Sequence, residues 1–413
     1  MYVSFDQTGI IRAVSDHPVQ VPGLTTEKVK GRFWPKRIGT PFRAPVVKKS
    51  KDLRVAVVCN WNSPCGISTY SKFLVDALRP KVKEIHIFSE IENHPTEADG
   101  LDVTRCWKRG TPMRHAARQI LDWKPDLVIT QHEFGIFPNA TYFLQYLEMM
   151  NSVRHLMVMH SVYEHLDKTI CTAQVKNMVV HNPHAEAVLR ERGHRNNVHY
   201  IPHGCFEFGD VKELWNIFRT PYVVMQFGFG FYYKGVDRAL EAMALMKQRQ
   251  PEKYRDLFYC YLCSENPHNS FVHDEYYHHL LAKAKALGIE DNVAIMRGYH
   301  SEEILNNYLR TAKIAIFPYV NSSDNTVYGA SGAARLAMAN KIPVIVSESH
   351  LFDDLAGTLP RIDSAESLAT EIDEIFSNGL YRAAMLEKSE KYCQDNNWNV
   401  TADRYLALYP ECK

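Results

Sequence analysis

Apolar runs alternate with amphipathic stretches along the first half of the chain. Residues 53–59 form a largely apolar run, which predicts a buried strand, and apolar side chains recur at helical spacing over 67–78. Further strands are expected over 84–88, 126–131, 155–160, 177–180 and 198–201, and further helices over 113–123, 139–149 and 183–191. Regular alternation of this kind predicts a doubly wound parallel sheet.

The same pattern starts again near residue 221, after a linker. Strands are expected over 222–227, 257–263, 292–296, 314–317 and 342–346, and helices over 236–247, 273–287, 301–311 and 333–339. A last helical pattern contains Trp398 and Tyr405. We therefore predict an α/β protein with an N-terminal doubly wound domain over 51–215, a C-terminal one over 216–389 and a final helical segment over 390–413.

Small residues precede the helix expected over 333–339. The four residues 329–332 read Gly-Ala-Ser-Gly. Small side chains let a ligand approach the backbone, and the free amides and dipole of a helix N-terminus favour an anion such as phosphate. Taken by itself, this stretch is explained equally well as an ordinary connection between a strand and a helix with a tight turn. Loops that contain Gly66 and Gly228 follow the first strand of each unit, where open α/β sheets usually bind phosphate or substrate.

Polar side chains stand at the carboxyl ends of several expected strands. His132 and Glu133 follow one strand, His160 ends the next, and Tyr299 follows a strand of the second unit. The carboxyl ends of the strands form the ligand crevice of an open α/β sheet, so a histidine there is well placed for chemistry. A helix-capping or core role is the alternative for each histidine.

The composition is that of an ordinary globular protein. Of 413 residues, 46% are hydrophobic, and the net charge of +1 excludes binding of nucleic acid through the overall charge. The nine cysteines lack a disulfide-framework spacing, and Cys260 and Cys263 would point to opposite faces of a strand. The sequence shows no signal-peptide pattern and no apolar run long enough to span a bilayer. We expect free thiols and a cytoplasmic location.

The first fifty residues differ from the rest of the chain. They contain five prolines, and up to Lys51 ten Lys and Arg residues stand against three acidic residues, a local charge of +7. Weak periodicity predicts an extended basic arm over 1–50 with a small hairpin near Val3–Val14. The arm is either a solvated extension or a contact for a polyanionic partner.

Five motifs stand in a fixed order along the chain. They are a glycine loop at 65–67, strand ends at 131–137 and 159–161, a glycine loop at 228–235 and a strand–helix–strand unit at 318–345. Together they resemble the motifs of GT-B glycosyltransferases of the large retaining family 4, the glycosyl transferases group 1. The resemblance runs from about Leu53 to Leu408. It implies a GT-B fold, in which two Rossmann-like domains face a central cleft and a C-terminal helix around Trp398 crosses back to the first domain.

The resemblance also implies an activity and the residues that carry it. A hexose-type sugar would move from a nucleotide-diphosphate sugar to an acceptor, with retention of anomeric configuration. The catalytic residues would be His160, near the sugar, and Lys234, on the diphosphate. The implied donor-binding residues are Gly66, Gly228, Lys234, Tyr299, Tyr328, Ser331 and Gly332, and the implied acceptor-binding residues are His132 and Glu133. We expect no cofactor and no required metal ion, because no DxD arrangement stands at a strand end.

The sequence departs from the family at three donor positions. Tyr328 and Leu336 stand where many members have a pair of glutamates, and Phe229 stands where an arginine usually precedes the loop lysine. The segment 330–333 resembles the version of this helix found in a subset of the family. Two alternatives stay open, namely a same-fold enzyme such as a nucleotide-sugar 2-epimerase and a catalytically inactive sugar-nucleotide-binding module. The acceptor is a glycan, a lipid, a protein or a modified nucleic acid, and the basic arm favours a polyanionic one.

Overall fold

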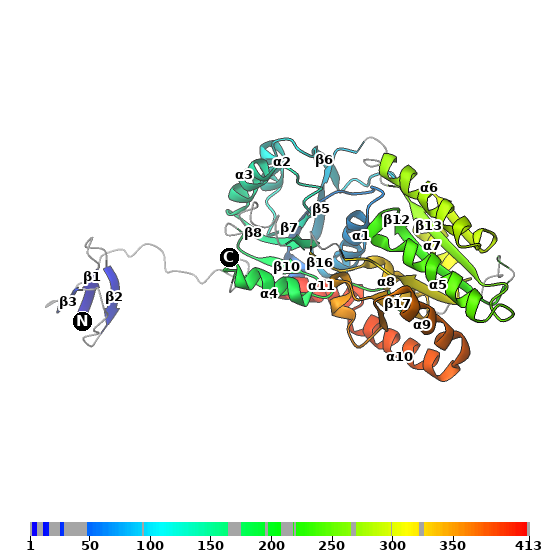
Figure 1. The fold of residues 1–413 in the computed structure, drawn as a ribbon. Helices are drawn as coiled ribbons and strands as arrows, with labels where there is room; N and C mark the ends of the chain where they lie inside the picture. Colours follow the sequence, from blue (N-terminus) through cyan, green and yellow to red (C-terminus); the bar gives the residue numbers. More distant parts are fainter. Residues whose placement is uncertain are drawn as a thin grey trace. The chain divides into compact units, whose positions relative to one another are not determined.

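The structure is a computed structural model of the whole chain. It describes residues 2–5, 11–15, 25–28, 48–92, 95–163, 175–194, 197–207, 218, 220–265, 270–298, 300–321 and 326–410. The chain divides into two compact units, Met1–Val47 and Lys48–Lys413. Figure 1 shows the helices and strands of both units.

The smaller unit contains a three-stranded antiparallel sheet in the order β2-β1-β3. Its strands are β1 (Tyr2–Phe5), β2 (Ile11–Ser15) and β3 (Thr25–Lys28). Val3 pairs with Val14, so the hairpin predicted for this region is present. The third strand was not predicted, because its four residues, Thr-Thr-Glu-Lys, carry no apolar alternation.

The first domain of the larger unit is built on a seven-stranded parallel sheet in the order β11-β10-β8-β7-β4-β5-β6. Its strands are β4 (Arg54–Cys59), β5 (Glu84–Glu90), β6 (Val103–Trp107), β7 (Leu127–His132), β8 (Arg154–Met159), β10 (Met178–Val180) and β11 (Val198–Tyr200). Its helices are α1 (Gly66–Leu78), α2 (Arg114–Asp122), α3 (Ala140–Met150) and α4 (Pro183–Glu191). Strand β6 was not predicted. Most of its side chains are only partly buried, so its residues, Val-Thr-Arg-Cys-Trp, do not form the continuous apolar run of a buried strand.

The second domain is built on a six-stranded parallel sheet in the order β14-β13-β12-β15-β17-β18. Its strands are β12 (Val223–Phe229), β13 (Phe258–Ser264), β14 (Val293–Arg297), β15 (Ile314–Phe317), β17 (Val344–Ser347) and β18 (Arg361–Ile362). Its helices are α5 (Val236–Arg249), α6 (Ser270–Ala286), α7 (Glu302–Leu309), α8 (Gly332–Ala339), α9 (Ala365–Ser377) and α10 (Gly379–Asp395). The two doubly wound sheets confirm the predicted fold class.

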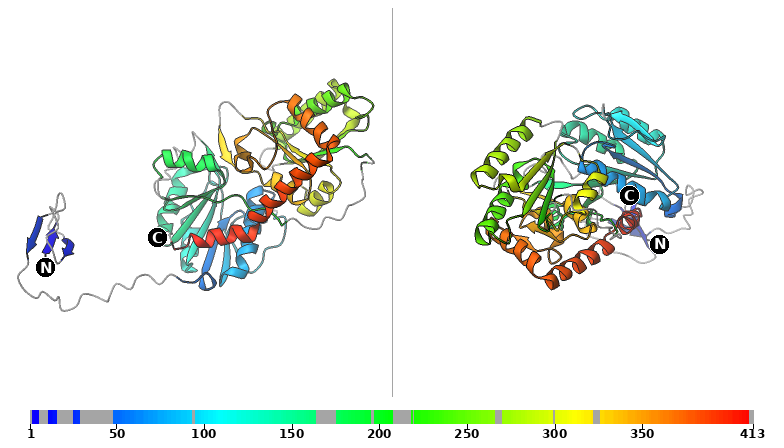
Figure 2. Two further views of the ribbon diagram at one scale, coloured as in Figure 1. Left: turned by 90° about the horizontal axis from the view of Figure 1, so that it is seen from below. Right: turned by 90° about the vertical axis from the view of Figure 1, so that its right-hand side faces the viewer.

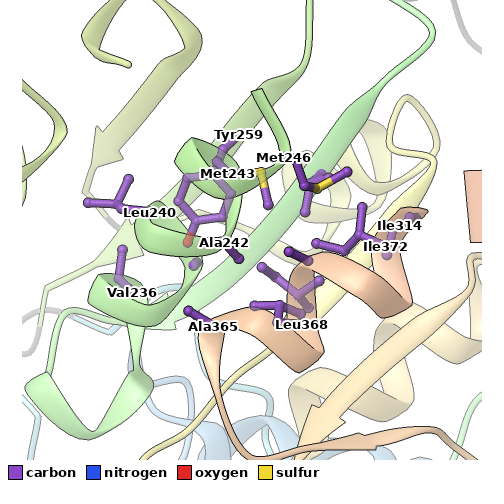
Figure 3. Packing of buried hydrophobic residues seen from close by; sticks show 14 of the residues in the cluster. Val236, Leu240, Ala242, Met243, Met246, Tyr259, Ile314, Ala365, Leu368 and Ile372 are labelled. Carbon is purple, nitrogen blue, oxygen red and sulfur yellow. The ribbon is translucent and has the colours of Figure 1, made fainter. Parts of the chain in front are cut away.

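One hydrophobic cluster holds the outer layer of the second domain together. Helices α5 and α9 pack side by side, and the cluster includes Leu240 and Met243 of α5 together with Leu368 and Ile372 of α9 (Figure 3). These four side chains are at most 2% exposed. Burial of a side chain of this size contributes about 1.5–3 kcal/mol, so the cluster fixes α5 and α9 over this face of the sheet.

The last helix, α11 (Trp398–Ala407), returns to the first domain. Figure 2 shows α10 on the second domain and α11 along the first. The Tyr405 hydroxyl lies 2.9 Å from the Tyr70 hydroxyl of α1, and Asp403 pairs with Lys81 at 2.7 Å. The predicted crossing helix is therefore confirmed. Among the described residues, no helix is both long and apolar enough to cross a membrane.

A two-stranded antiparallel sheet joins the two domains directly. Strand β9 (Ser161–Tyr163) follows His160 in the first domain, and β16 (Val327–Gly329) precedes helix α8 in the second. The backbone of Gly329 lies opposite Ser161, and a Cβ at Gly329 would lie 2.9 Å from the His160 carbonyl oxygen. A side chain at position 329 would therefore collide with the first domain, and glycine allows the two backbones to pair here.

We expect Trp398→Ala to destabilise the whole larger unit. The Trp398 ring packs against Tyr70 at 4.9 Å and is 9% exposed, and a Cβ on Gly204 of the linker would lie 2.5 Å from it. Removing a buried tryptophan side chain costs about 3–5 kcal/mol. Urea unfolding measures the loss. Leu380→Ala is the control, because Leu380 on α10 is 86% exposed, and equal midpoints for the two variants would show that α11 contributes nothing to stability.

Candidate functional site

The N-terminus of helix α8 lies at the carboxyl ends of the second sheet. Strand β15 ends at Phe317, and Ser331 caps α8, its side chain accepting from the Ala334 amide. The first amides of a helix have no intrahelical acceptor, so those of Gly332 and Ala333 are available to a ligand. The helix dipole adds a partial positive charge at the same place.

Lys234 adds a full positive charge beside this helix. It closes the short 3-10 helix Tyr232–Lys234, and Gly235 follows with a φ of +66°. A Cβ at Gly235 would overlap the Pro318 carbonyl oxygen, so glycine lets the loop lie against the end of β15. The Lys234 amine also lies close to Gly228, near the end of β12. A Cβ added to Gly228 would be 3.8 Å from it.

A tyrosine close to the helix cap holds the Lys234 amine. The Lys234 amine donates to the Tyr319 hydroxyl at 2.8 Å and lies 4.0 Å from the centre of the Tyr319 ring. Burial raises the pKa of the Tyr319 hydroxyl, and the nearby Ser331 side chain opposes this shift. The structure thus brings together Lys234, Gly228, Ser331 and Gly332, which are all predicted donor-binding residues, and their contact with a donor stays a prediction.

His160 lies at the first-domain side of the same region. Its Nε2 donates to Gln131 Oε1 at 2.8 Å, and its ring packs against Tyr70 at 4.8 Å. Burial lowers its pKa well below the usual range, and the neighbouring His181 and His132 lower it further. The imidazole is therefore neutral near pH 7, and Nδ1 keeps a lone pair that can accept a hydrogen bond.

His203 of the interdomain linker is a site residue that the sequence motifs did not single out. A Cβ at Gly332 would lie 3.3 Å from His203 Nε2, so the ring faces the start of α8. Burial lowers the pKa of His203 well below its usual range, and Arg335 and His181 lower it further. Nδ1 donates to the Gly204 carbonyl at 2.8 Å, which leaves Nε2 as an acceptor. The sequence signal for this position was the segment Ile201-Pro202-His203-Gly204, which stands in the linker between the two expected domains.

The three remaining predicted donor-binding residues do not belong to the group around Lys234 and the start of α8. Gly66 begins α1 and is exposed, and a Cβ there would meet no described atom within 4 Å, which leaves space for a ligand. The Tyr328 ring lies 4.8 Å from the His350 ring, in the contact between the domains. Tyr299 lies outside the described residues. Their roles in donor binding stay predictions.

The two predicted acceptor residues differ in exposure. His132 is fully buried, and its ring stacks on Phe137 at 5.7 Å with an angle of 8° between the planes. Glu133 is partly exposed and accepts from the Gly135 amide at 2.5 Å. Contact of His132 with an acceptor therefore requires its aromatic packing to open, whereas Glu133 is reached from solvent.

The arrangement can bind an anion that carries hydroxyl groups. Lys234 and the first amides of α8 supply positive charge at the carboxyl ends of β12 and β15. The free nitrogens of His160 and His203 supply neutral acceptors for hydroxyl groups. A diphosphate joined to a sugar has this combination of groups.

Comparison with protein families identifies the second domain. Residues 221–378 match the family described as Glycosyl transferases group 1. The match contains both Lys234 and helix α8, and it confirms the predicted family resemblance for the two motifs of this domain, at 228–235 and 318–345. No curated protein matches the chain in sequence.

Solved structures share the fold of the larger unit. The trehalose-6-phosphate synthase OtsA is 11% identical, with a TM-score of 0.67 over 87% of this chain and 99% of that chain. Anabaena Alr3699/HepE in complex with UDP and glucose is 11% identical, with a TM-score of 0.65 over the same shares. The UDP-forming α,α-trehalose-phosphate synthase from Burkholderia xenovorans in complex with glucose-6-phosphate is 10% identical, with a TM-score of 0.67 over 86% of this chain and 100% of that chain. The chain thus has the predicted GT-B fold.

We expect His132→Phe to weaken the acid sensitivity of the fold. Burial lowers the pKa of His132 to about 3, and neither ring nitrogen has a hydrogen-bond partner among the described residues. The unfolded chain protonates this histidine near pH 6.5, so stability falls as the pH drops from there toward 3.

The loss attributable to His132 is about 2 kcal/mol at pH 5 relative to pH 8, and the variant lacks it. Urea unfolding at a series of pH values measures this difference. A variant whose unfolding free energy depends on pH as steeply as the wild type would contradict the assignment of His132 as a buried neutral group.

Proposed function

We propose, on the premise that residues 221–378 match the glycosyl transferases group 1 within a GT-B fold, that this protein is a retaining glycosyltransferase. It moves a hexose-type sugar from a nucleotide-diphosphate sugar to an acceptor. The observation that supports the proposal is the position of Lys234, which donates to Tyr319 next to the N-terminus of α8. A cation and a helix dipole at this position suit the diphosphate of such a donor, which develops charge during the transfer.

Leaving-group stabilisation is the main catalytic effect in this proposal. The diphosphate gains negative charge as the bond between the sugar and the phosphate breaks. Lys234 and the amides of Gly332 and Ala333 are already oriented, so they stabilise that charge without reorganising. These groups take the role that a metal ion has in other transferases, so the transfer itself needs no cofactor and no metal ion.

Two neutral histidines orient the sugar. His160 Nδ1 and His203 Nε2 can each accept a hydrogen bond from a hydroxyl group, because the other ring nitrogen of each already donates to a protein oxygen. His160 belongs to the first domain and His203 to the linker, so both reach the sugar only when the two domains are together. Such positioning raises the rate by holding the reacting groups in one geometry.

The donor is proposed to be a uridine diphosphate sugar. Two of the solved structures with this fold were determined with UDP and glucose and with UDP-2-fluoro glucose. A panel of UDP, GDP and ADP sugars, followed by thermal shift, identifies the base and sugar together, since a bound ligand raises the melting temperature. No shift with any member of the panel would overturn the proposal.

The products separate the proposed function from its alternatives. A transferase releases nucleoside diphosphate only when an acceptor is present, or slowly to water. A 2-epimerase changes the sugar without requiring an acceptor, and a binding module shows a thermal shift without any turnover. Product analysis by chromatography of the nucleotides and sugars distinguishes the three outcomes.

We expect Lys234→Ala to lower kcat strongly, by about 2–4 kcal/mol of transition-state stabilisation. Stability without nucleotide should hardly change, because this side chain is only partly buried. Lys234→Arg should recover part of the activity, since the charge persists with a different geometry. Lys313→Ala is the matched control, because Lys313 is exposed at the amino end of β15. Near-normal kcat in Lys234→Ala would remove the donor site from this loop.

We also expect deletion of residues 1–50 to change the use of the acceptor without changing donor binding. Nine Lys and Arg residues stand against three acidic residues in this segment, and this net charge of +6 motivates the expectation. The apparent KM for a polyanionic acceptor should rise, and the rise should disappear at high salt, where charge interactions are screened. Loss of the thermal shift by the donor on deletion would show instead that these residues support the donor site.

A further inference from the structure

Two histidines and an aspartate from both domains meet beside the strand pair β9–β16. His184 lies on α4 of the first domain, and His350 and Asp353 lie on the 3-10 helix His350–Leu355 of the second. Asp353 Oδ2 lies 2.7 Å from His184 Nδ1 and 2.8 Å from His350 Nδ1. The three ligand atoms lie within 4.8 Å of one another.

The chemistry of these atoms is that of a transition-metal site. Two imidazole nitrogens and one carboxylate oxygen are ligands that Zn²⁺ takes in proteins, with a fourth position held by water. A tetrahedral zinc site separates neighbouring ligand atoms by about 3.3 Å, given metal–nitrogen distances of 2.0–2.1 Å. The two carboxylate contacts, of 2.7 and 2.8 Å, must lengthen by about 0.5 Å, and the two imidazole nitrogens, which lie within 4.8 Å of each other, must take up the same spacing. The exposed fractions of the His184 and His350 side chains, 60% and 39%, give both rings room to turn toward a shared ion.

Surrounding groups orient the carboxylate toward the histidines. Asp353 is only 5% exposed, and Arg361 lies 3.5 Å from its other oxygen, Oδ1. The charge of Arg361 is balanced by Glu348, at 3.0 Å. Asn182 donates to the His350 carbonyl and, at 3.4 Å, to Asp353 Oδ2. Outer groups that hold a ligand in this way are a regular part of metal sites.

We propose that His184, His350 and Asp353 form a binding site for a divalent transition-metal ion of the zinc class, which ties the first domain to the second. When the ion binds, each neutral imidazole carries its proton on Nε2 instead of Nδ1, so both Nδ1 lone pairs are directed at the ion and no net charge is lost from the rings. The site shares no residue with the Lys234 loop, and the proposal gives it no part in breaking the sugar–phosphate bond.

The position of the site relates it to the start of helix α8. Asn182, which caps α4, also donates to the Gly329 carbonyl at 3.1 Å, and the Ser331 amide donates to the Leu351 carbonyl at 3.2 Å. An ion held by both domains therefore stabilises the arrangement in which β9 pairs with β16. Metal binding and any ligand that requires the domains together must then favour each other by the same factor.

The test is a titration of the EDTA-treated full chain with ZnCl₂ by isothermal titration calorimetry, without nucleotide. We expect one ion per chain and a rise in melting temperature on binding. His184→Ala and His350→Ala should each weaken binding by more than about tenfold, since each loses a ligand. His278→Ala, which removes an exposed histidine of α6 that is 3.8 Å from Asp274, should bind as the wild type does.

A spectroscopic measurement on the wild type covers the case in which the variants fail to fold. Electron paramagnetic resonance of the chain loaded with one equivalent of Cu²⁺ should show coupling to two imidazole nitrogens. Absence of one-to-one binding, equal binding in all three variants, or a Cu²⁺ spectrum without nitrogen coupling would each overturn the proposal. Because no nucleotide is used, these outcomes are independent of the proposed transferase activity.

Discussion

The buried ion pair between Arg335 and Asp354 joins the parts of the molecule that form the site. Both side chains are at most 1% exposed. Burial alone lowers the pKa of Arg335, but Asp354 more than offsets this effect, and the pKa is raised. The guanidinium also donates to the Ser331 carbonyl at 2.8 Å, the His203 carbonyl at 3.3 Å and the Tyr392 hydroxyl at 3.1 Å. One side chain thus fixes the start of α8, the linker and α10. Loss of one partner of such a pair costs about 3–5 kcal/mol, because the other charge is left unpaired in the core.

Most ionisable groups around the site are neutral or paired, whereas Lys234 keeps its positive charge. Arg335 is neutralised by Asp354, and burial keeps His160, His181 and His203 neutral by lowering their pKa values. Lys234 therefore provides the main positive charge near the start of α8. This division suits a ligand whose anionic part lies at the helix and whose hydroxyl groups face the imidazoles. It also keeps three imidazole rings packed around Tyr70 without mutual repulsion.

The contact between the domains rests on backbone pairing and on short polar side chains. Strand β9 follows His160 directly and β16 precedes α8, so the pairing of these strands links the first-domain histidine to the second-domain helix. The Asn182 side chain reaches across to the Gly329 carbonyl and the Asp353 carboxylate. The same few residues thus set the distance between the two halves of the candidate site.

The sequence by itself determined the two parallel sheets, most of their helices and the crossing helix. Apolar runs and helical spacing are local patterns, and a buried strand such as β15 or a helix such as α5 carries its own signal. The order of five motifs also identified the loop of Lys234 and the start of α8. Only the tertiary structure decided the pairing of β9 with β16, the burial of His132, and the positions of His203 and Arg335. Strands of three residues and buried polar side chains depend on partners far away in the chain, and those partners are fixed only when the two domains come together.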